Sequence, residues 1–176
     1  MYVFNTKEEL KTGIRDWVED EEAAIKKYGD VNTWDVSSIT DFSSLFMYTP
    51  FMGYNFDSDI SSWDVSNGTD FSEMFSKTRF NQDISKWDVS NGTDFSGMFS
   101  NADAIIQDIG NWDVSNGTNF NSMFSNADAF NQDIGNWDVS NGTYFSYMFS
   151  NADAFNQDIG NWDVSNGTDF KGMFSY

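Results

Sequence analysis

The sequence has no cysteine and no histidine, and only one proline among its 176 residues. Without cysteine the chain can form no disulfide, no thiolate metal site and no cysteine nucleophile. Without histidine it lacks the side chain that most often serves as a general base or metal ligand. These absences remove common catalytic groups, and the remaining candidates, the aspartates, recur in every repeat, whereas a catalytic pair is unique; we therefore expect no catalytic residues and no enzymatic activity.

Cationic residues are scarce as well. Nine Lys and Arg stand against 28 Asp and Glu, which gives a formal net charge of −19. The stretch 87–170 contains twelve Asp but no Glu, Lys or Arg. Repulsion from phosphate excludes a nucleic-acid partner and argues against an anionic membrane surface. Such a charge favours cations, a basic partner or simple solubility.

Long hydrophobic runs are also missing. No stretch of 18 apolar residues occurs, so we expect no membrane insertion. Residues 1–4 lack the basic and apolar regions of a signal peptide, although a cleaved or upstream signal stays open.

What the sequence does contain is one unit repeated along most of its length. At 112–136 the unit reads Trp-Asp-Val-Ser-Asn-Gly-Thr-Asn-Phe-Asn-Ser-Met-Phe-Ser-Asn-Ala-Asp-Ala-Phe-Asn-Gln-Asp-Ile-Gly-Asn. Near copies occupy 34–62, 63–86, 87–111 and 137–161, and an incomplete copy occupies 162–176. Repetition at this period predicts a repeat solenoid over 34–176, built from leucine-rich-repeat-like stacked coils.

Each coil is expected to begin with a short β-strand. Residues 112–115 alternate apolar and polar side chains, which favours a strand with one buried face. Asn116-Gly117 is a strong turn dipeptide and would end that strand.

A helical or 3₁₀ turn is expected to follow the strand. Phe120, Met123 and Phe124 have the spacing of one helix face, and Thr118 would be the N-cap. No coil can bury its apolar side chains alone, so each depends on its neighbours. The side chains expected to point inward are Trp112, Val114, Phe120, Met123, Phe124, Ala127, Phe130 and Ile134, with their equivalents in every coil.

Residues 1–33 differ in kind from the repeats. Thr6 and Glu9 have the spacing of a capping box, and Gly29 fits a helix stop. We predict one amphipathic helix over 6–28, with a short strand at 2–4, which together form an N-terminal α-helical cap on the first coil. The last copy ends midway through a coil at Tyr176, and an open edge there could recruit a second chain.

The repeat resembles that of the BspA-like leucine-rich-repeat surface proteins, a 25–26-residue type found in bacterial and mycoplasmal surface lipoproteins. The similarity rests on Trp-Asp-Val-Ser-Asn-x-Thr-x-Phe-x-x-Met-Phe and on Phe-Asn-Gln-Asp-Ile. It implies a leucine-rich-repeat solenoid, a cell-surface or extracellular location, and a role in adhesion or molecular recognition. The chain departs from that family by placing Gly where Val is usual, as at Gly117, and Phe where Met is frequent, as at Phe120. The bulkier Phe would refill the volume that the Val leaves.

The tripeptide Asn-Gly-Thr recurs at one repeat position and matches the N-glycosylation sequon. The candidate glycosylation residues are Asn67, Asn91, Asn116, Asn141 and Asn166. The alternative is a buried ladder in which each amide bonds the backbone of the neighbouring coil.

One aspartate per coil should stack into a column of like charges. The candidate calcium ligands are Asp88, Asp113, Asp138 and Asp163. Calcium accepts oxygen ligands of this kind, and it is the one candidate cofactor. The alternative is that these carboxylates accept backbone N–H groups at turns.

The first copy carries about four extra residues between Phe46 and Phe56. Its exposed apolar groups could bind a partner, or could fold as a flap over the cap. The candidate partner-binding residues are Tyr48, Phe51, Met52 and Tyr54. The stacked Trp side chains could bind glycans, but a buried stack is favoured.

These observations predict a non-enzymatic extracellular or cell-surface repeat protein for adhesion or molecular recognition. Its partner would be a protein or glycan surface ligand. The alternative is a structural subunit of an extracellular fibre or appendage, with or without glycans, which would self-associate through the open C-terminal coil.

Overall fold

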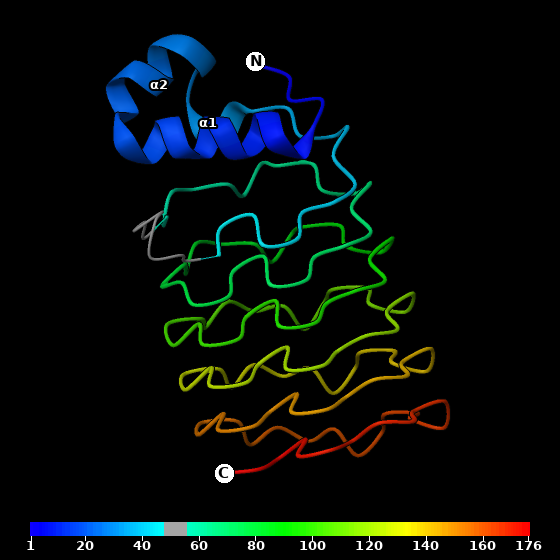
Figure 1. Ribbon diagram of the computed structural model, residues 1–176. Helices are drawn as coiled ribbons and strands as arrows, with labels where there is room; N and C mark the ends of the chain where they lie inside the picture. Colours follow the sequence, from blue (N-terminus) through cyan, green and yellow to red (C-terminus); the bar gives the residue numbers. More distant parts are fainter. Residues whose placement is uncertain (48–55) are drawn as a thin grey trace.

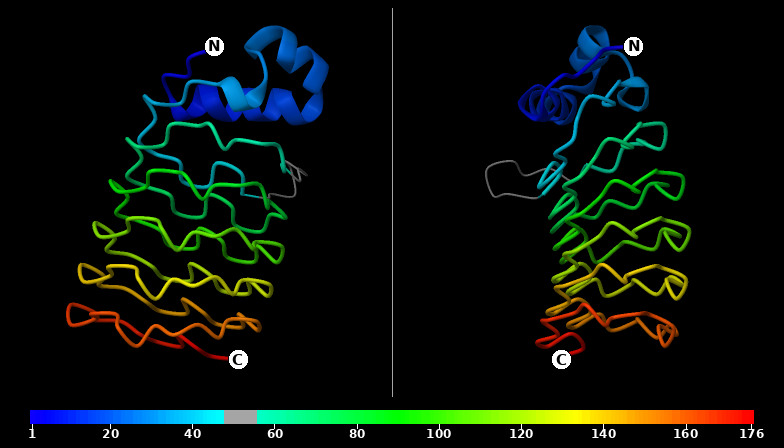
Figure 2. Two further views of the ribbon diagram at one scale, coloured as in Figure 1. Left: turned by 180° about the vertical axis from the view of Figure 1, so that it is seen from behind. Right: turned by 90° about the vertical axis from the view of Figure 1, so that its right-hand side faces the viewer.

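A computed structural model describes residues 1–47 and 56–176 of the chain. The helices lie at one end, and the repeat units lie one below another from there to the C-terminus (Figure 1). The views from behind and from the side show the same arrangement (Figure 2). We call each repeat unit, with the boundaries given above, a layer.

Two α-helices and a short 3₁₀ helix form the N-terminal cap: α1 (Lys7–Glu19), α2 (Glu21–Tyr28) and η1 (Val31–Thr33). The capping box is present, since Thr6 and Glu9 exchange side-chain and backbone hydrogen bonds. The single helix expected over 6–28 is wrong, because Asp20 breaks it. The Asp20 N–H ends α1 on the Asp16 carbonyl, and the Asp20 carboxylate accepts the Ala23 N–H to begin α2.

Polar contacts hold the two helices together. Lys27 Nζ and the Tyr28 hydroxyl of α2 both donate to Asp16 of α1, at 2.9 and 2.7 Å. Hydrogen bonds from Lys27 and then Tyr28 hold the pKa of Asp16 below its ordinary value. The break at Asp20 therefore turns α2 back so that it can bond α1.

The cap packs closely on the first layer. Gly13 of α1 is buried, and a Cβ atom there would lie 2.7 Å from the Phe4 ring and 3.2 Å from the Trp34 ring. Glycine is thus required by the close approach of two aromatic side chains. Lys7 Nζ donates to Asp41 at 2.7 Å and ties the start of α1 to the same layer.

The strand expected at 2–4 is reduced to one isolated parallel bridge between Val3 and Asp35. No helix among the described residues is long and apolar enough to cross a membrane.

The expected leucine-rich-repeat solenoid is wrong in its building blocks. Within the described part of 34–176 there is no helix and no β-strand, only turns, bends and isolated parallel bridges. The bridges between layers join Asp41 to Asp70, Asp70 to Asp94, Asp94 to Asn119, Asn119 to Tyr144, and Tyr144 to Asp169. The chain is therefore a stack of turn-built layers and not a stack of strand-plus-helix coils.

A left-handed residue explains the missing helical turn at 120–124. Ser122 has a φ of +55°, which reverses the backbone and prevents continuation into a helix. The Met123 N–H still bonds the Phe120 carbonyl at 3.2 Å, so the local structure is an isolated turn. Thr118 is not an N-cap, because its hydroxyl donates to the Thr93 carbonyl of the preceding layer at 3.1 Å.

An aspartate turn replaces the strand expected at 112–115. The Asp113 carboxylate accepts the Ser115 N–H at 3.0 Å, which is an Asx-turn. The Gly117 N–H then bonds the Val114 carbonyl at 2.8 Å and closes a second turn. The alternation of apolar and polar side chains in 112–115 therefore results from successive turns and not from an extended backbone.

Backbone hydrogen bonds still join the layers at every second residue. The N–H groups of Phe120, Ser122 and Phe124 donate to carbonyls of the next layer at 2.8, 2.8 and 2.9 Å. Because left-handed residues recur in every layer, this ladder links turn to turn and forms no continuous strand.

The expected inward-facing side chains are confirmed in 112–136, but the prediction is wrong for the last layer, where Val164, Phe170 and Phe174 are exposed. Each of the eight predicted residues in 112–136 is 4% exposed or less. Phe rings stack from layer to layer, with centroids 5.7 Å apart for Phe95 and Phe120 and 5.5 Å for Phe120 and Phe145. The buried Trp stack is also confirmed, and Trp112 Nε1 donates to the Ile84 carbonyl at 3.1 Å.

The glycine of each Asn-Gly pair and the phenylalanine three residues later occur together for a steric reason. A Cβ atom at Gly117 would lie 2.4 Å from the tip of the Phe120 ring and 2.9 Å from the Val114 carbonyl oxygen. The ring therefore occupies the space that a larger side chain would need, as the volume argument from sequence expects.

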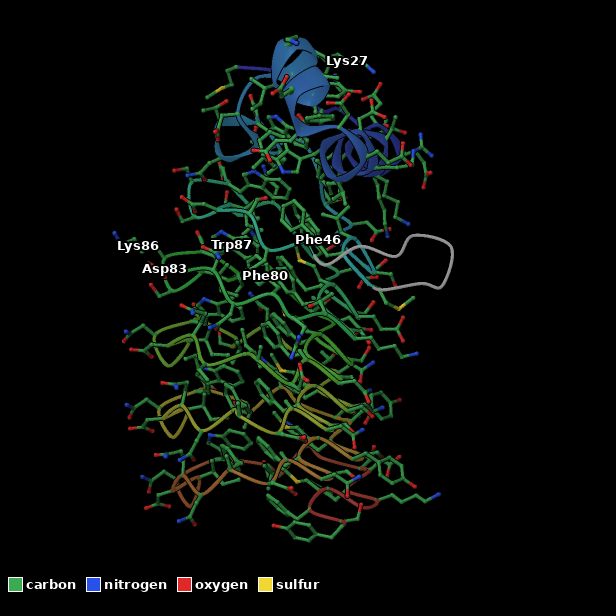
Figure 3. The ribbon with its side chains drawn as sticks, turned by 90° about the vertical axis from the view of Figure 1, so that its left-hand side faces the viewer. Lys27, Phe46, Phe80, Asp83, Lys86 and Trp87 are labelled. Atoms are coloured by element: carbon green, nitrogen blue, oxygen red, sulfur yellow. The ribbon has the colours of Figure 1, made fainter. Side chains whose placement is uncertain are left out.

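Figure 3 shows the same division between core and edge in the first two layers. Phe46 and Phe80 lie inside the stack with ring centroids 6.4 Å apart, whereas Asp83 and Lys86 lie at its outer edge. Hydrogen bonds from the Ser85 hydroxyl and N–H hold the pKa of Asp83 below its ordinary value.

Candidate binding face

One part of each layer, which we call the ladder face, combines the interlayer hydrogen bonds with a row of exposed polar side chains. It comprises 69–77, 93–101, 118–126, 143–151 and the incomplete 168–176. In the four complete segments the Phe and Met side chains are buried, whereas the Asp and Asn side chains and most of the Ser side chains are at least partly exposed; Ser76, Ser146 and Ser150 are buried. The ladder thus gives these polar groups a fixed spacing along the stack.

A groove of about 500 Å³ crosses three layers of the ladder face. Hydroxyl and amide groups dominate its lining, together with one carboxylate and one ammonium group. The lining residues are Ser72, Glu73, Ser76, Lys77, Ser96, Gly97, Ser100, Asn119, Asn121 and Ser122.

Gly97 forms the floor of the groove. It occupies the left-handed position of its layer, where neighbouring layers carry Glu73 and Ser122. A Cβ atom at Gly97 would lie 3.3 Å from Glu73 Cγ, so the Glu73 side chain lies across the glycine. The hollow therefore results from a missing side chain at one repeat position.

Two exposed tyrosines lie on the next layer of the same face. Tyr144 pairs with Asn119 of the groove through a parallel bridge. The Tyr147 ring lies across Gly172, where a Cβ atom would be 2.6 Å from its edge, and Lys171 Nζ lies 5.6 Å from the ring centroid. Contacts with Gly172 and Lys171 thus hold the partly exposed Tyr147 ring in place on the layer after the groove.

Aspartates hold the polar groups of the groove in place. The Ser72 hydroxyl donates to Asp70 and the Ser96 hydroxyl donates to Asp94, each at 2.6 Å. Asn119 Nδ2 donates to the same Asp94 carboxylate at 3.1 Å. Because these side chains are already bonded, little conformational entropy remains to be lost on binding a ligand.

The asparagine column forms a hydrogen-bonded ladder that is exposed. Each amide nitrogen donates to a serine carbonyl of the preceding layer, as Asn116 Nδ2 does to Ser90 at 2.7 Å. The ladder residues are Asn67, Asn91, Asn116, Asn141 and Asn166, and all five are exposed. Exposure leaves room for a glycan that the buried ladder would exclude, so glycosylation stays a prediction.

The aspartate column accepts backbone N–H groups. The residues Asp88, Asp113, Asp138 and Asp163 each bond the serine N–H two residues on, at 2.9–3.0 Å. The Ser140 hydroxyl and N–H lower the pKa of Asp138, and the Ser165 N–H and hydroxyl lower that of Asp163, although the Asp138 carboxylate acts to raise it.

No group of three or more metal-binding side chains converges within residues 1–47 and 56–176. Calcium binding by this column stays a prediction. The candidate partner-binding residues Tyr48, Phe51, Met52 and Tyr54 lie outside the described residues.

The groove was not predicted from the sequence, although the aligned repeats contain a signal for it. The left-handed position varies from layer to layer while its neighbours stay nearly constant. Its residues are Ser44, Glu73, Gly97, Ser122, Tyr147 and Gly172. Variation on the surface of a repeated scaffold is typical of a recognition surface, and it also occurs here at the position of Asn119 and Tyr144.

A comparison with known protein families assigns the sequence to one of them. One family profile, described as Mycoplasma protein of unknown function, DUF285, matches residues 1–127 and again residues 93–176, so that the two matches span the whole chain. The chain belongs to the DUF285 family. No curated protein and no solved structure was found to match it. Overlapping matches are expected for a DUF285 chain of near-identical units, because the profile can align in more than one register.

Proposed function

We propose that this protein is a non-enzymatic recognition protein of the cell surface that binds a glycan on its ladder face. The groove over Gly97, with the supported Tyr147 ring beside it, carries the proposal. Hydroxyl and amide side chains act as both donors and acceptors, which suits the hydroxyl groups of a sugar. An aromatic ring adds a large apolar surface for the C–H face of a pyranose.

The charge of the groove favours a ligand without phosphate or sulfate groups. Glu73 and Lys77 are the ionisable residues in its lining, and both are exposed. The protein as a whole carries a net charge of −19 and repels anions. A neutral or cationic glycan therefore fits better than an acidic one.

The repetition of the carboxylates argues against catalysis. Hydrolysis of a glycosidic bond requires two carboxyl groups in distinct environments. Aspartates of this chain instead recur at equivalent positions in successive layers, where they accept turn N–H groups. The resemblance to BspA-like surface proteins supports an extracellular or cell-surface location and a role in adhesion.

Binding of the labelled full-length chain to a panel of neutral, amino and acidic oligosaccharides tests the proposal. We expect saturable binding to a neutral or amino sugar, and Tyr147→Ala should weaken it by roughly tenfold or more, as loss of an aromatic anchor does. Ile106→Ala is the matched control, since Ile106 is an exposed apolar residue outside the ladder face.

Three results would contradict the proposal. These are binding to no glycan, equal loss of binding in both variants, or binding of acidic sugars alone. Capture of a protein ligand that Tyr147→Ala abolishes, with no glycan bound, would move the function of the ladder face to protein recognition.

A further inference from the structure

The groove on the ladder face runs from layer to layer along the stack. Its lining combines residues of the layers 63–86, 87–111 and 112–136. Two repeat positions contribute in all three layers, the first with Ser72, Ser96 and Asn121, and the second with Glu73, Gly97 and Ser122. A ligand that follows the groove therefore meets an equivalent set of positions once in each layer.

Backbone hydrogen bonds fix the interval between these positions. The Glu73 N–H donates to the Ser96 carbonyl at 2.8 Å, and the Gly97 N–H donates to the Asn121 carbonyl at 2.7 Å. Parallel backbone segments joined in this way lie about 4.8 Å apart. An extended chain of β-1,4-linked pyranoses advances by nearly the same distance with each sugar residue, so its residues stay in step with the layers.

An extended polypeptide does not match this interval. It advances by about 3.3 Å per residue, and its side chains point to the same side only at every second residue. Neither distance equals the separation of the layers. The groove therefore favours a sugar polymer over a peptide that lies in the same direction.

The serine hydroxyls of the groove act as acceptors toward a ligand. The Ser72 hydroxyl proton is committed to Asp70 and the Ser96 hydroxyl proton to Asp94, each with an oxygen–oxygen distance of 2.6 Å. Each serine oxygen keeps lone pairs that can accept a further hydrogen bond. The ligand must therefore bring an O–H or N–H donor to successive layers, which a sugar chain does with every residue.

The two ends of the groove differ. Toward the cap, the Ser44 hydroxyl donates to the Glu73 carboxylate at 3.1 Å, and the described residues of layer 34–62 contribute nothing to the lining. Toward the C-terminus, the Tyr147 ring follows on layer 137–161, where it is 37% exposed and lies against Gly172. The layers that a ligand can contact are therefore the three of the groove and the one that carries Tyr147.

We propose that the ligand is a linear β-1,4-linked glycan that lies along the stack, with one sugar residue on each of these four layers. The inference rests on the glycan-binding function proposed above and adds the linkage and the length of the glycan. In this arrangement three sugar residues bond the groove, and the fourth packs its C–H face on the Tyr147 ring.

Calorimetric titration of the full-length chain with β-1,4-linked oligosaccharides of two to six residues tests the inference, with glucose, N-acetylglucosamine and glucosamine series as probes. In the series that binds, affinity should rise by roughly tenfold or more from two residues to four, because linked groups fill further sites at high effective concentration. It should not rise from four residues to six. Chains of glucose with α-1,4 linkage coil instead, and they should show no such rise.

Tyr147→Ala should end the rise in affinity at three residues, because it removes the surface on which the fourth sugar packs. Ile106→Ala is the matched control and should keep the rise up to four residues, since Ile106 is an exposed apolar residue outside the ladder face. Thermal unfolding checks that both variants keep the fold of the parent protein.

The opposite results overturn the inference. The glycan does not lie along the stack in this register if two residues bind as tightly as four, if α-1,4-linked chains show the same rise, or if Tyr147→Ala still gains affinity from three residues to four. Binding of other glycans, with none of the three β-1,4-linked series bound, overturns the inference and leaves the proposed function standing. Binding of no glycan at all overturns both.

Discussion

Layers 137–161 and 162–176 begin with the same seven residues, Trp-Asp-Val-Ser-Asn-Gly-Thr, yet their side chains lie in different environments. Val139, Phe145 and Phe149 are 1%, 0% and 4% exposed, whereas their equivalents in the last layer are at least one-third exposed. The local turns are the same in both layers, since Gly142 and Gly167 bond Val139 and Val164 in the same way.

This difference separates two kinds of interaction. Turns and aspartate hydrogen bonds form within a layer and do not need a neighbour. Burial of the aromatic side chains needs a layer on each side, which is the nearest-neighbour behaviour of repeat proteins. Equivalent substitutions in an inner layer and in the last layer should therefore change the free energy of unfolding by different amounts only where the side chain is buried between two layers.

Removal of a core ring should show the largest difference. Phe120→Ala should lower the free energy of unfolding by about 3–5 kcal/mol, because it leaves a cavity between two layers. Phe170→Ala should cost less than half as much, since the Phe170 ring packs on one side only. Urea unfolding of both variants measures this, and equal costs would show that burial between layers is not what stabilises the stack.

A smaller steric effect is expected at Gly135 and Gly160, the glycines that follow Ile134 and Ile159. A Cβ atom at Gly135 would lie 2.5 Å from the Asp158 carbonyl oxygen of the next layer, while one at Gly160 meets only its own layer's Asp158 carboxylate, at 3.0 Å. Gly135→Ala should destabilise by about 1–3 kcal/mol.

Gly160→Ala should be neutral or slightly stabilising, because alanine restricts the unfolded chain. Thermal unfolding of the two variants under one set of conditions makes the comparison. A destabilising effect of the same size at both sites would mean that the interlayer contact is not its cause.

The asparagine ladder should show no difference between the layers. Asn116 and Asn166 both donate backward to the preceding layer, at 2.7 and 2.8 Å, so the last layer keeps its bond. Asn116→Ala and Asn166→Ala should each cost about 1 kcal/mol or less, as expected for one exposed hydrogen bond. Chemical unfolding distinguishes this from a cost found in the inner layer alone, which would indicate a cooperative ladder.

Acid should have the smallest effect, again equal in both layers. Hydrogen bonds within each layer lower the pKa of Asp138 and Asp163 below 3.8 in the folded state. A lowered folded-state pKa means that the stabilising contribution is present above about pH 4 and is lost as the pH falls through that folded-state pKa. In melting curves from pH 6 to pH 3, Asp138→Asn and Asp163→Asn should each lose slightly less stability than the parent protein.

An identical loss of stability in the parent and both variants would mean that these carboxylates do not contribute to the acid response of the fold.

The core was predictable because it depends on period and hydrophobicity alone. Phe120, Met123 and Phe124 are buried as their spacing indicates. The backbone conformation was not predictable, because the spacing of Phe120, Met123 and Phe124 is compatible both with a helical turn and with a chain that reverses at Ser122. No sequence pattern marks a serine that adopts a positive φ. At Ser122 the positive φ occurs together with a hydrogen bond from its N–H to the Ser146 carbonyl of the next layer.

The candidate site was harder to predict than the core. Asparagine and aspartate columns are visible in the repeat. The aspartates accept turn N–H groups as one alternative expected, and the asparagines form the expected bonds to the neighbouring layer, but the asparagine ladder is exposed and not buried. The groove depends on how Glu73 lies across Gly97, and the position of the Tyr147 ring depends on its contact with Gly172; both are decided by which layers are neighbours in the stack. Fold-level expectation from the family resemblance failed because turns can repeat with the period of strands and helices.

The stack of phenylalanine rings also bears on how the molecule could change in length. Successive inner layers meet through equivalent contacts, since Phe71, Phe95, Phe120 and Phe145 stack in turn with centroids 5.5–5.7 Å apart. Duplication or loss of one whole repeat in the gene would create no new interface and would leave the cap unchanged. Length could therefore vary by recombination between repeats while the packing of the remaining core residues is conserved, and the distance from the cap to the last layer would grow in equal steps.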